Sequence, residues 1–506
     1  MRLSVEPAKL GNIARSLISR SFDMENPVDA LPSTLFNAKY NEATRQGDFK
    51  AENPFDNDFN AVKMLGEGSY GKVMLAKRRS NGAERAIKII RKKEYEGKKY
   101  EREFQILKEL NHPNVLKYYG SYEHKRKVYL VTEYCPGREL LTEIRQSGKM
   151  TERKAQNYFR EIIEALCYIH SRNIVHRDLK PENIIIEKES KNVKLIDFGL
   201  SKKIEKNKDK MKSEVGTFMY SSPQVDDGRY TKKCDVWSAG IILYLMLTGR
   251  YPFDCDNVNG ILKLKKNFKL TFKEYYWERV SPAAKNLLSR CISIKESDRY
   301  SAIEAWKHPW LQANASDHIL LDKTMVGKLW AYSKDSRLVN NIKYFVCAFN
   351  ELEKKETNLI KLFKKIDTDK NGELSLEEIL AAYDDNKAVF EGFGIAKDQL
   401  RLLFQQIDLD NSNSIDFLEF IVAIKNLSSD LNQKSLKKAF KELSGRDGYL
   451  DLESLRESLG GELPEHEWLL VLNKYDKDGN GKIDYNEFLS IFRPPTKSNI
   501  VVSPHN

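Results

Sequence analysis

The stretch His176-Arg177-Asp178-Leu179-Lys180-Pro181-Glu182-Asn183 most strongly constrains what this chain can fold into. Polar side chains at this density are unusual inside a helix, so the stretch predicts a loop between structured elements. In a loop, an acid, a lysine and an amide at this spacing can accept a hydroxyl proton, steady a transferring phosphoryl group and hold a magnesium ion. The alternative is an ordinary solvated turn, because Asp, Pro and Asn are common turn residues. Partner motifs elsewhere in the chain decide between these interpretations.

The size and composition of the chain indicate a globular protein of several domains. Its 506 residues exceed what one hydrophobic core supports, so roughly two to four domains are expected. The composition is 41% hydrophobic and 31% charged, which is ordinary for an ordered protein. The 84 basic and 73 acidic residues leave a net charge of +11, an excess too diffuse to predict nucleic-acid binding.

Cysteine spacing and apolar runs indicate the compartment. The cysteines show no C-x-x-C pair and no zinc-like spacing; they are Cys135, Cys167, Cys234, Cys255, Cys291 and Cys347. We therefore expect free thiols in a reducing, cytoplasmic environment. No apolar segment follows Met1-Arg2-Leu3, and the longest apolar run, within 239–248, is too short to span a bilayer. N-myristoylation needs glycine at position 2, which is Arg2, so we expect no such anchor.

A glycine motif follows a polar N-terminal stretch. Residues 1–58 show no sustained periodicity and predict a flexible extension. From Phe59 the pattern reads strand, glycine turn, strand, with G-x-G-x-x-G-x-V from Gly66 to Val73. Glycines let main-chain amides approach phosphates, because a Cβ would hold them away. The motif alone is weak evidence, but a dinucleotide-binding interpretation fails because no helix opens after Gly71.

A lysine and a glutamate follow at suggestive positions. The next expected strand, 84–90, carries Lys88 among β-branched residues, at a spacing that puts its ammonium beside nucleotide phosphates. The helix expected at about 100–110 offers Glu103 to hold Lys88, with Glu101 and Glu109 as less well placed alternatives. A buried strand over 128–135 then runs into Pro136-Gly137, which suits a hinge between two lobes.

A further acid completes the set. Leu195-Ile196-Asp197-Phe198-Gly199 predicts a β-run that ends in a carboxylate able to ligate a second metal position. A glycine loop, a strand lysine, a helix glutamate, a polar loop and this acid now occur in order. Together they resemble a eukaryotic protein kinase domain over about residues 59–311. The resemblance implies a bilobal α+β fold that transfers the γ-phosphate of ATP, with Mg²⁺, to protein substrates.

The resemblance also implies roles for individual residues. Asp178 would be the catalytic base, Lys180 would steady the phosphoryl group, and Asn183 and Asp197 would hold magnesium. The ATP site would be formed by Leu65, Gly66, Gly68, Gly71, Val73, Ala86, Lys88, Glu103, Glu133, Cys135 and Glu139. None of the essential positions is substituted.

The family pattern breaks at Ser222-Pro223-Gln224, where kinases carry A-P-E. The usual glutamate there pairs with a distant arginine, which Arg299 matches in this chain. A glutamine can still accept a hydrogen bond from a guanidinium, but it lacks the charge-assisted part, on the order of 1 to 3 kcal/mol for a buried pair. We expect a somewhat looser activation segment in a working enzyme.

Activation and substrate choice depend on nearby charges. Ser213 lies where many kinases take an activating phosphate, and Arg177 could pair with it. The adjacent Glu214 offers a permanent negative charge as the alternative. Glu139 and Glu182 resemble the acids that favour arginine upstream of the target residue. The resemblance therefore implies a basophilic Ser/Thr kinase.

Residues 322–352 predict one basic amphipathic helix, because apolar residues recur at helical spacing among basic ones. The apolar positions are Leu338, Ile342, Phe345, Phe349 and Leu352, and the basic ones are Lys323, Lys328, Lys334 and Arg337. One interpretation is a connector packed on the preceding lobe. The other is a target helix for a calcium sensor, which the following loops favour.

Three later stretches match the twelve-residue calcium loop of an EF-hand. Each offers oxygen ligands at regular positions: Asp367, Asp369, Asn371, the Glu373 carbonyl and Glu378 in the first loop; Asp408, Asp410, Ser412, Ser414, Asp416 and Glu419 in the second; Asp476, Asp478, Asn480, Lys482, Asp484 and Glu487 in the fourth. Asn413 replaces the turn glycine of the second loop, and asparagine tolerates the left-handed conformation needed there.

The third repeat is damaged. With Ser444 at the first ligand position, Gly448-Tyr449-Leu450 falls one residue early and Ser454 stands near the place of the terminal glutamate. A residue and the key acids are missing, so we expect this repeat to fold without calcium.

The whole order is similar to that of the calcium-dependent protein kinases of plants and protists. It implies a flexible extension (1–58), a kinase domain (59–311), an autoinhibitory junction (312–352), a calmodulin-like domain of four EF-hand repeats (353–493) and a tail (494–506). By this resemblance the junction obstructs the kinase without calcium, and calcium-loaded EF-hands capture it. No methionine follows Met325, so the EF-hand grooves are expected to fit this one tethered helix. We expect a monomer.

Two other classes of function remain open at this point. One is a non-catalytic, calcium-responsive scaffold weakened at Gln224. The other is a kinase that needs free calmodulin, which the built-in EF-hands disfavour. Intact catalytic positions favour the enzyme.

Overall fold

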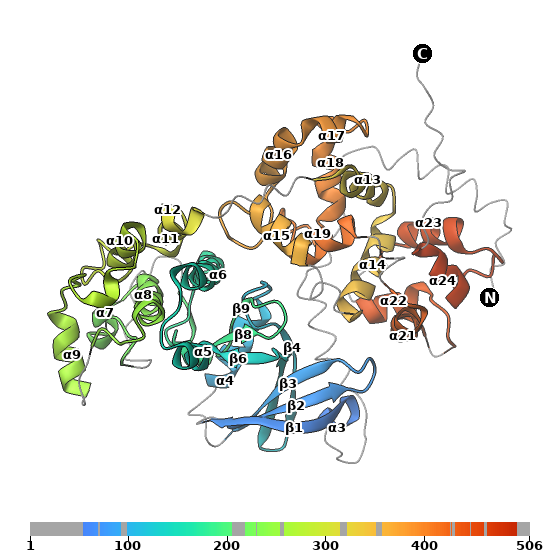
Figure 1. Ribbon diagram of the computed structural model, residues 1–506. Coiled ribbons are helices and arrows are strands. Elements are labelled where there is room, and N and C mark those ends of the chain that lie inside the picture. Colours follow the sequence, from blue (N-terminus) through green and yellow to red (C-terminus); the bar gives the residue numbers. More distant parts are fainter. Residues whose placement is uncertain are drawn as a thin grey trace. The chain divides into compact units, whose positions relative to one another are not determined.

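The computed structural model describes residues 54–68, 71–92, 99–204, 218–228, 230–253, 258–313, 321–350, 357–425, 427, 431–445, 447–459 and 463–492. Within these ranges the chain forms two compact units (Figure 1). One comprises residues 54–313 with 367–372, and the other comprises residues 321–366 with 373–492. Residues 1–53 of the expected N-terminal extension, the C-terminal tail, Ser213, Glu214 and Leu352 lie outside the described residues. The last five residues of that extension form a short helix, Pro54–Asp58.

An antiparallel five-stranded sheet forms the small lobe of the first unit (Figure 1). Its order is β1-β2-β3-β5-β4, from β1 (Phe59–Gly68), β2 (Gly71–Arg78), β3 (Glu84–Arg91), β4 (Tyr118–His124) and β5 (Lys127–Glu133). Helix α3 (Pro54–Asp58) precedes the sheet, and α4 (Lys99–Lys108) follows β3. Ile87 and Ile90 of β3 are fully buried. The register places Val73 and Leu130 on either side of Lys88, so the lysine emerges from the middle of the sheet.

Helices dominate the large lobe of the same unit. They are α5 (Leu140–Ser147), α6 (Glu152–Ser171), α7 (Pro223–Asp226), α8 (Lys233–Thr248), α9 (Val258–Lys266), α10 (Pro282–Cys291), α11 (Ala302–Trp306) and α12 (Pro309–Gln312), with 3₁₀ turns at Pro181–Asn183 and Tyr275–Trp277. The short strands are β6 (Gly137–Glu139), β7 (Ile174–Val175), β8 (Ile184–Glu187), β9 (Val193–Leu195) and β10 (Lys202–Lys203). Helix α8 is apolar all round and almost wholly buried, as expected for the central helix of a core. The polar stretch 176–183 lies between β7 and β8, outside any α-helix, as predicted.

The second unit is all-helical. Its elements are α13 (Lys323–Tyr332), α14 (Arg337–Asn350), α15 (Thr357–Ile366), α16 (Leu376–Asp385), α17 (Lys387–Glu391), α18 (Gln399–Ile407), α19 (Phe417–Ile424), α21 (Gln433–Leu443), α22 (Leu452–Leu459), α23 (Glu465–Tyr475) and α24 (Tyr485–Ile491). Single antiparallel bridges join the loops in pairs, Leu374 to Ile415 and Leu450 to Ile483. The predicted fold class, a bilobal kinase fold followed by helical EF-hands, is confirmed.

The prediction of one continuous helix over 322–352 is wrong. The structure has two helices there, α13 and α14, separated by a turn at residues 333–336. Ser336 explains the break, because its hydroxyl accepts a 3.4 Å hydrogen bond from the amide of Val339 and so caps the start of α14. The predicted apolar positions Leu338, Ile342, Phe345 and Phe349 are all buried in α14.

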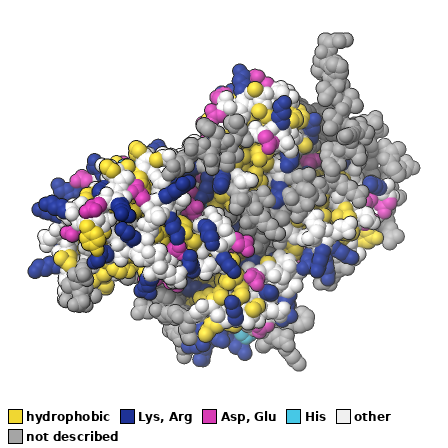
Figure 2. All heavy atoms as spheres, in the orientation of Figure 1, with side chains coloured by type: hydrophobic (Ala, Val, Ile, Leu, Met, Phe, Trp, Pro, Cys, Tyr) yellow, Lys and Arg dark blue, Asp and Glu magenta, His cyan; other side chains and the backbone are white. Residues whose placement is uncertain are grey.

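Basic and acidic side chains are mixed on the visible face of the large lobe (Figure 2). Figure 2 shows Lys and Arg side chains spread over the large lobe and interspersed with Asp and Glu on this face. In the part of the chain that the structure describes, none of the helices is both long and apolar enough to cross a membrane.

Candidate active site and calcium-binding loops

An ion-pair chain connects the small lobe to the large lobe. The ammonium of Lys88 on β3 lies 2.7 Å from the carboxylate of Glu103 on α4 and 3.4 Å from that of Asp197. Glu103 is 3% exposed, so it holds Lys88 from a dry site. Burial alone would raise the pKa of the Asp197 carboxyl, but the Lys88 ammonium and the amide of Gly199 outweigh it and hold that pKa below its ordinary value. Asp197 therefore stays ionised, as a metal ligand must be.

In the polar loop, two of the predicted catalytic side chains contact the carboxylate of the third, Asp178. The Lys180 ammonium donates to Asp178 Oδ2 at 2.8 Å, and the Asn183 amide donates to the same oxygen at 3.1 Å. Asn183 also donates to the main-chain carbonyl of Asp178 at 2.9 Å. These contacts fix the Asp178 side chain. Its carboxylate lies beside the Lys180 ammonium and beside the Asn183 side chain, whose amide oxygen could ligate a metal.

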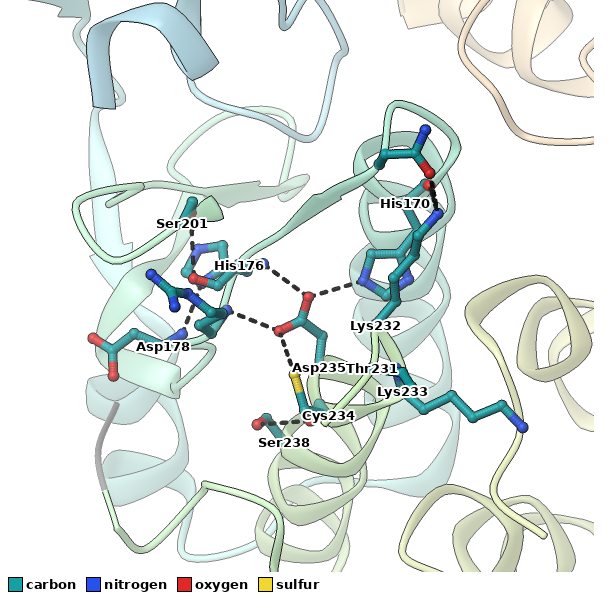
Figure 3. A network of polar contacts seen from close by, with 12 residues as sticks. His170, His176, Asp178, Ser201, Thr231, Lys232, Lys233, Cys234, Asp235 and Ser238 are labelled. Atoms are coloured by element: carbon teal, nitrogen blue, oxygen red, sulfur yellow. Dashed lines mark hydrogen bonds and ion pairs between the residues drawn. The ribbon is translucent and has the colours of Figure 1, made fainter. Parts of the chain in front are cut away.

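Asp235, at the start of α8, holds this loop from behind (Figure 3). Its carboxylate accepts from the amides of His176 at 2.8 Å and Arg177 at 2.9 Å, and contacts Nε2 of His170 at 2.8 Å. Arg177 has φ +68°, a left-handed conformation that a non-glycine residue adopts only when its surroundings enforce it. Burial would raise the pKa of Asp235, but the His170 bond and the nearby imidazoles and amides hold it below the ordinary value.

The nucleotide-facing positions surround the sheet end. Gly71 has φ +140°, and a Cβ there would lie 1.9 Å from the carbonyl oxygen of Ile89, so only glycine fits. Leu65 and Glu139 are exposed, while Val73, Ala86 and Cys135 are partly buried. Glu133 is buried and pairs at 2.8 Å with Lys194 of β9. This pair ties the linker between the lobes to the strand that leads to Asp197.

The activation segment keeps its tether despite the missing glutamate. The Arg299 guanidinium donates to Gln224 Oε1 at 2.7 Å, as the sequence suggested that a glutamine could allow. In addition, the Gln224 amide donates to the carbonyl of Ile294 at 2.6 Å, a bond that a carboxylate could not make. Arg299 is 1% exposed, and burial lowers its pKa to about 10.

Carboxylates converge in three of the four EF-hand loops. The groups are Asp367, Asp369 and Glu378; Asp408, Asp410 and Glu419; and Asp476, Asp478 and Glu487, each with ligand oxygens within 4.8 Å of one another. Three acids around one point, with further amide and hydroxyl oxygens nearby, form the hard-oxygen donor set that Ca²⁺ takes. In each of these three loops the main-chain amide of the sixth residue (Gly372, Asn413 or Gly481) donates to the first aspartate.

The second loop shows the electrostatic strain of such a donor set. Burial, together with Asp410, raises the pKa of Asp408 to about 6. Burial, with Asp416 and Asp410 nearby, raises the pKa of Glu419 well above its ordinary value. A divalent cation would relieve this mutual repulsion. Asn413 has φ +61°, which confirms the left-handed conformation predicted for it.

The third loop departs from the others. Among the described residues, it does not bring three acids together as its neighbours do. Ser454 takes the place of the terminal glutamate: its hydroxyl accepts from the amide of Asp451 at 3.0 Å, and its own amide donates to the Asp451 carboxylate at 2.8 Å. Lys482 of the fourth loop reaches across and pairs with Asp447 and, at 3.4 Å, with Asp451. A lysine ammonium therefore supplies positive charge to this loop.

Comparison with known proteins agrees with this geometry. The protein kinase domain family matches residues 59–311, and the EF-hand domain pair family matches residues 356–425 and 433–493. The chain is 34% identical over 441 residues to calcium-dependent protein kinase 5 of Plasmodium falciparum (isolate 3D7), covering 84% of this chain and 76% of that relative. It is 32% identical over 456 residues to calcium-dependent protein kinase 4 of Plasmodium berghei (strain Anka), covering 86% of each. The chain belongs to the calcium-dependent protein kinases.

As a calcium-dependent protein kinase, it is a Ser/Thr protein kinase that uses ATP and Mg²⁺ and carries EF-hands for Ca²⁺, as the sequence predicted. Two residues of this site carried no assigned role in the sequence. They are Asp235, near the start of α8, and Lys194, in the short apolar strand β9. A buried acid or lysine between apolar neighbours is the signal that could have found them.

Proposed function

We propose that this calcium-dependent protein kinase transfers the ATP γ-phosphate with Asp178 as the base that accepts the proton of the Ser or Thr hydroxyl. The observation that carries this proposal is the convergence of Lys180 and Asn183 on the Asp178 carboxylate. Lys180 is then placed to balance charge on the transferring group, and Asn183 to orient Asp178 and offer its amide oxygen to metal.

The nucleotide is proposed to lie between the glycine turn and the linker. Gly66, Gly68 and Gly71 would let main-chain amides approach the phosphates, and Lys88, held by Glu103, would reach them. The remaining contacts to adenine and ribose come from Leu65, Val73, Ala86, Glu133, Cys135 and Glu139. Asn183 and Asp197 would hold Mg²⁺, which neutralises phosphate charge when bound.

Calcium control is proposed to act through the junction, residues 312–352. Helices α13 and α14 pack inside the EF-hand unit, where α14 lies against α19, α21 and α23. The faces they bury are apolar and include Val326 and Leu329 on α13 and Ile342 and Phe345 on α14. A face buried there cannot cover the kinase domain at the same time. We infer that calcium binding at loops one, two and four favours this captured arrangement and that the junction obstructs catalysis without it.

The ligands proposed for calcium follow the loop positions. They are Asp367, Asp369, Asn371, Glu373 and Glu378 in the first loop, Asp408, Asp410, Ser412, Ser414 and Glu419 in the second, and Asp476, Asp478, Asn480, Lys482 and Glu487 in the fourth, with Glu373 and Lys482 acting through their carbonyls. The converging carboxylates support this assignment.

Substrate preference is proposed to be basophilic. Glu139 is exposed, and Oε2 of Glu182 is buried without a hydrogen-bond partner among the described residues. A buried carboxylate oxygen without a donor is costly, and an arginine of a bound peptide would satisfy it. We also propose that the enzyme acts as a monomer in the cytoplasm. The free thiols of Cys135, Cys167, Cys234 and Cys291 support a reducing compartment.

One experiment separates the candidate functions. Phosphorylation of an arginine-containing and a neutral peptide is measured with the purified chain in calcium, in chelator, and with Asp178→Asn. We expect calcium-stimulated transfer to the basic peptide that falls at least about a thousandfold in the variant, because a base contributes up to roughly 10⁴-fold. Calcium binding without turnover would instead support a scaffold, and equal use of both peptides would overturn basophilic preference.

A further inference from the structure

A lysine is buried completely within the kinase domain. Lys265, near the end of α9, has 0% of its side chain exposed. Lysine is among the residues least often fully buried, because its ammonium loses its hydration. Its neighbours Lys263 and Lys266 on the same helix are exposed, so the burial of Lys265 is specific to this position.

The Lys265 ammonium closes on one short segment, residues 218–226. It pairs with the Asp226 carboxylate at 2.6 Å and donates to the carbonyls of Phe218 at 2.9 Å and Ser221 at 3.1 Å. It also contacts the Ser221 hydroxyl at 3.0 Å, and that hydroxyl donates to Asp226 at 2.7 Å. Two of the partners are main-chain carbonyls three residues apart. The lysine therefore fixes the backbone path of this segment as well as pairing with an acid.

The same segment is attached to the catalytic loop through α8. The Ser238 hydroxyl donates to the carbonyl of Tyr220 at 2.9 Å. Asp235, on the same helix, holds the amides of His176 and Arg177 (Figure 3). Ser238, which holds the Tyr220 carbonyl, and Asp235, which holds the loop that carries Asp178, are thus one turn apart on α8. Phe218, at the outer end of the segment, is 46% exposed.

Burying the charges of Lys265 and Asp226 costs free energy, because both groups lose their hydration. Burial lowers the pKa of Lys265 and raises the pKa of Asp226, and their mutual ion pair and hydrogen bonds offset only part of that. A buried ion pair often stabilises a fold no better than apolar residues of the same size. What apolar residues could not do is hold the two carbonyls in place, and that function explains why the charges are here.

We propose that Lys265 is a positioning residue for the protein substrate, setting the main-chain path of residues 218–222, which α8 links to the loop that carries Asp178. Exposed Phe218 and its neighbours then face the part of the acceptor chain next to the phosphorylated residue. The Lys265 contacts act together with the Gln224 tether to Arg299, which holds the other side of the same segment. The proposal rests on Asp178 as the base, and the Asp178→Asn variant tests that assignment separately.

The test compares three variants of the full chain in calcium. Lys265→Met alone leaves Asp226 buried without its cation, so it is accompanied by the double variant Lys265→Met with Asp226→Leu, which removes both charges. Lys263→Met is the matched control on the same helix. We expect the double variant to retain its circular dichroism and thermal transition but to raise KM for peptide about fivefold to tenfold, equivalent to roughly one or two lost hydrogen bonds. KM for ATP should change by less than about twofold.

Three other outcomes would contradict the proposed role of Lys265. A folded double variant with unchanged peptide KM would show that Lys265 only fills space. Equal increases in KM for peptide and ATP would indicate general damage to the domain and would also overturn the proposal. A change in the Lys263→Met control as large as that in the double variant would assign the effect to the charge of α9 instead.

Discussion

At the scale of single residues, Gln224 shows how an altered motif can keep its hydrogen bond to the distant arginine. The family's glutamate would give Arg299 a charged acceptor, but it would face the carbonyl of Ile294, to which Gln224 donates at 2.6 Å. We expect Gln224→Glu to change the unfolding free energy of the kinase domain by less than about 1 kcal/mol, because the added charge is offset by the lost donor. Gln224→Ala should cost about 1 to 3 kcal/mol, since it leaves buried Arg299 without this acceptor.

Chemical denaturation of both variants, followed by tryptophan fluorescence in chelator, checks these values. Asn267→Ala, at an exposed position, is the control. If Gln224→Glu raised the unfolding free energy by about 2 kcal/mol or more, the activation segment of the parent chain would be as loose as the sequence alone suggested.

Residues with specific chemistry were the most predictable part of the site. The pairing of Lys88 with Glu103, rather than with Glu101 or Glu109, followed from helical register and is present at 2.7 Å. Lys194 and Lys265 were not identified, because their partners Glu133 and Asp226 are brought to them only by the tertiary fold. Lys265 is followed in the sequence by Lys266, so its neighbours do not distinguish it from an exposed lysine.

At the scale of elements, the turn between α13 and α14 was hidden from periodicity, because apolar residues continue on both sides of it. Polar contacts bind this turn to both EF-hand pairs. Arg337 donates to the carbonyls of Asp408 at 3.0 Å and Leu409 at 2.7 Å in the second loop. Asp335 pairs at 2.7 Å with Lys474 of α23, and Glu467 of α23 accepts from the amide of Leu338 at 3.2 Å. The break therefore places polar groups where both pairs can hold them.

Arg337 should accordingly couple the second calcium loop to α14. We expect Arg337→Met to raise the calcium concentration for half-maximal kinase activity about threefold to tenfold, because charged hydrogen bonds to the loop are lost. Lys334→Met, an exposed basic residue in the same turn, is the matched control. Peptide phosphorylation across a calcium titration measures both. Equal midpoints for Arg337→Met and the parent chain would rule out this coupling.

At the scale of the whole molecule, we expect calcium to supply its free energy through the three loops in which carboxylates converge. Shifting a two-state enzyme from 1:99 to 99:1 active requires about 5.5 kcal/mol. Shared equally among three sites, each calcium contributes about 1.8 kcal/mol, a factor of roughly 20 in the equilibrium. We expect the third loop, with Ser454 at the glutamate position and Lys482 paired with its acids, to contribute nothing to this sum.

Removing one calcium site should therefore reduce maximal activity only slightly, and removing a second should reduce it steeply. Glu378→Gln, Glu419→Gln and Glu487→Gln each remove a carboxylate from one of the three acid groups. With two sites left, the ratio of active to inactive enzyme is about 5:1, so saturating calcium still gives roughly four-fifths of full activity. With one site left, the ratio falls to about 1:5, and less than a fifth remains.

Calorimetric calcium titration of the parent chain should find three ions, and two in each single variant, alongside the activity measurement. Ser454→Ala is the control, since it alters the third loop without removing a carboxylate. A fourth ion in the parent chain would contradict the interpretation of the third loop. A single variant that loses nearly all activity would show that one site dominates, and equal sharing of the free energy would then be wrong. The steep fall between two sites and one follows only if every ion favours the same captured arrangement of α13 and α14.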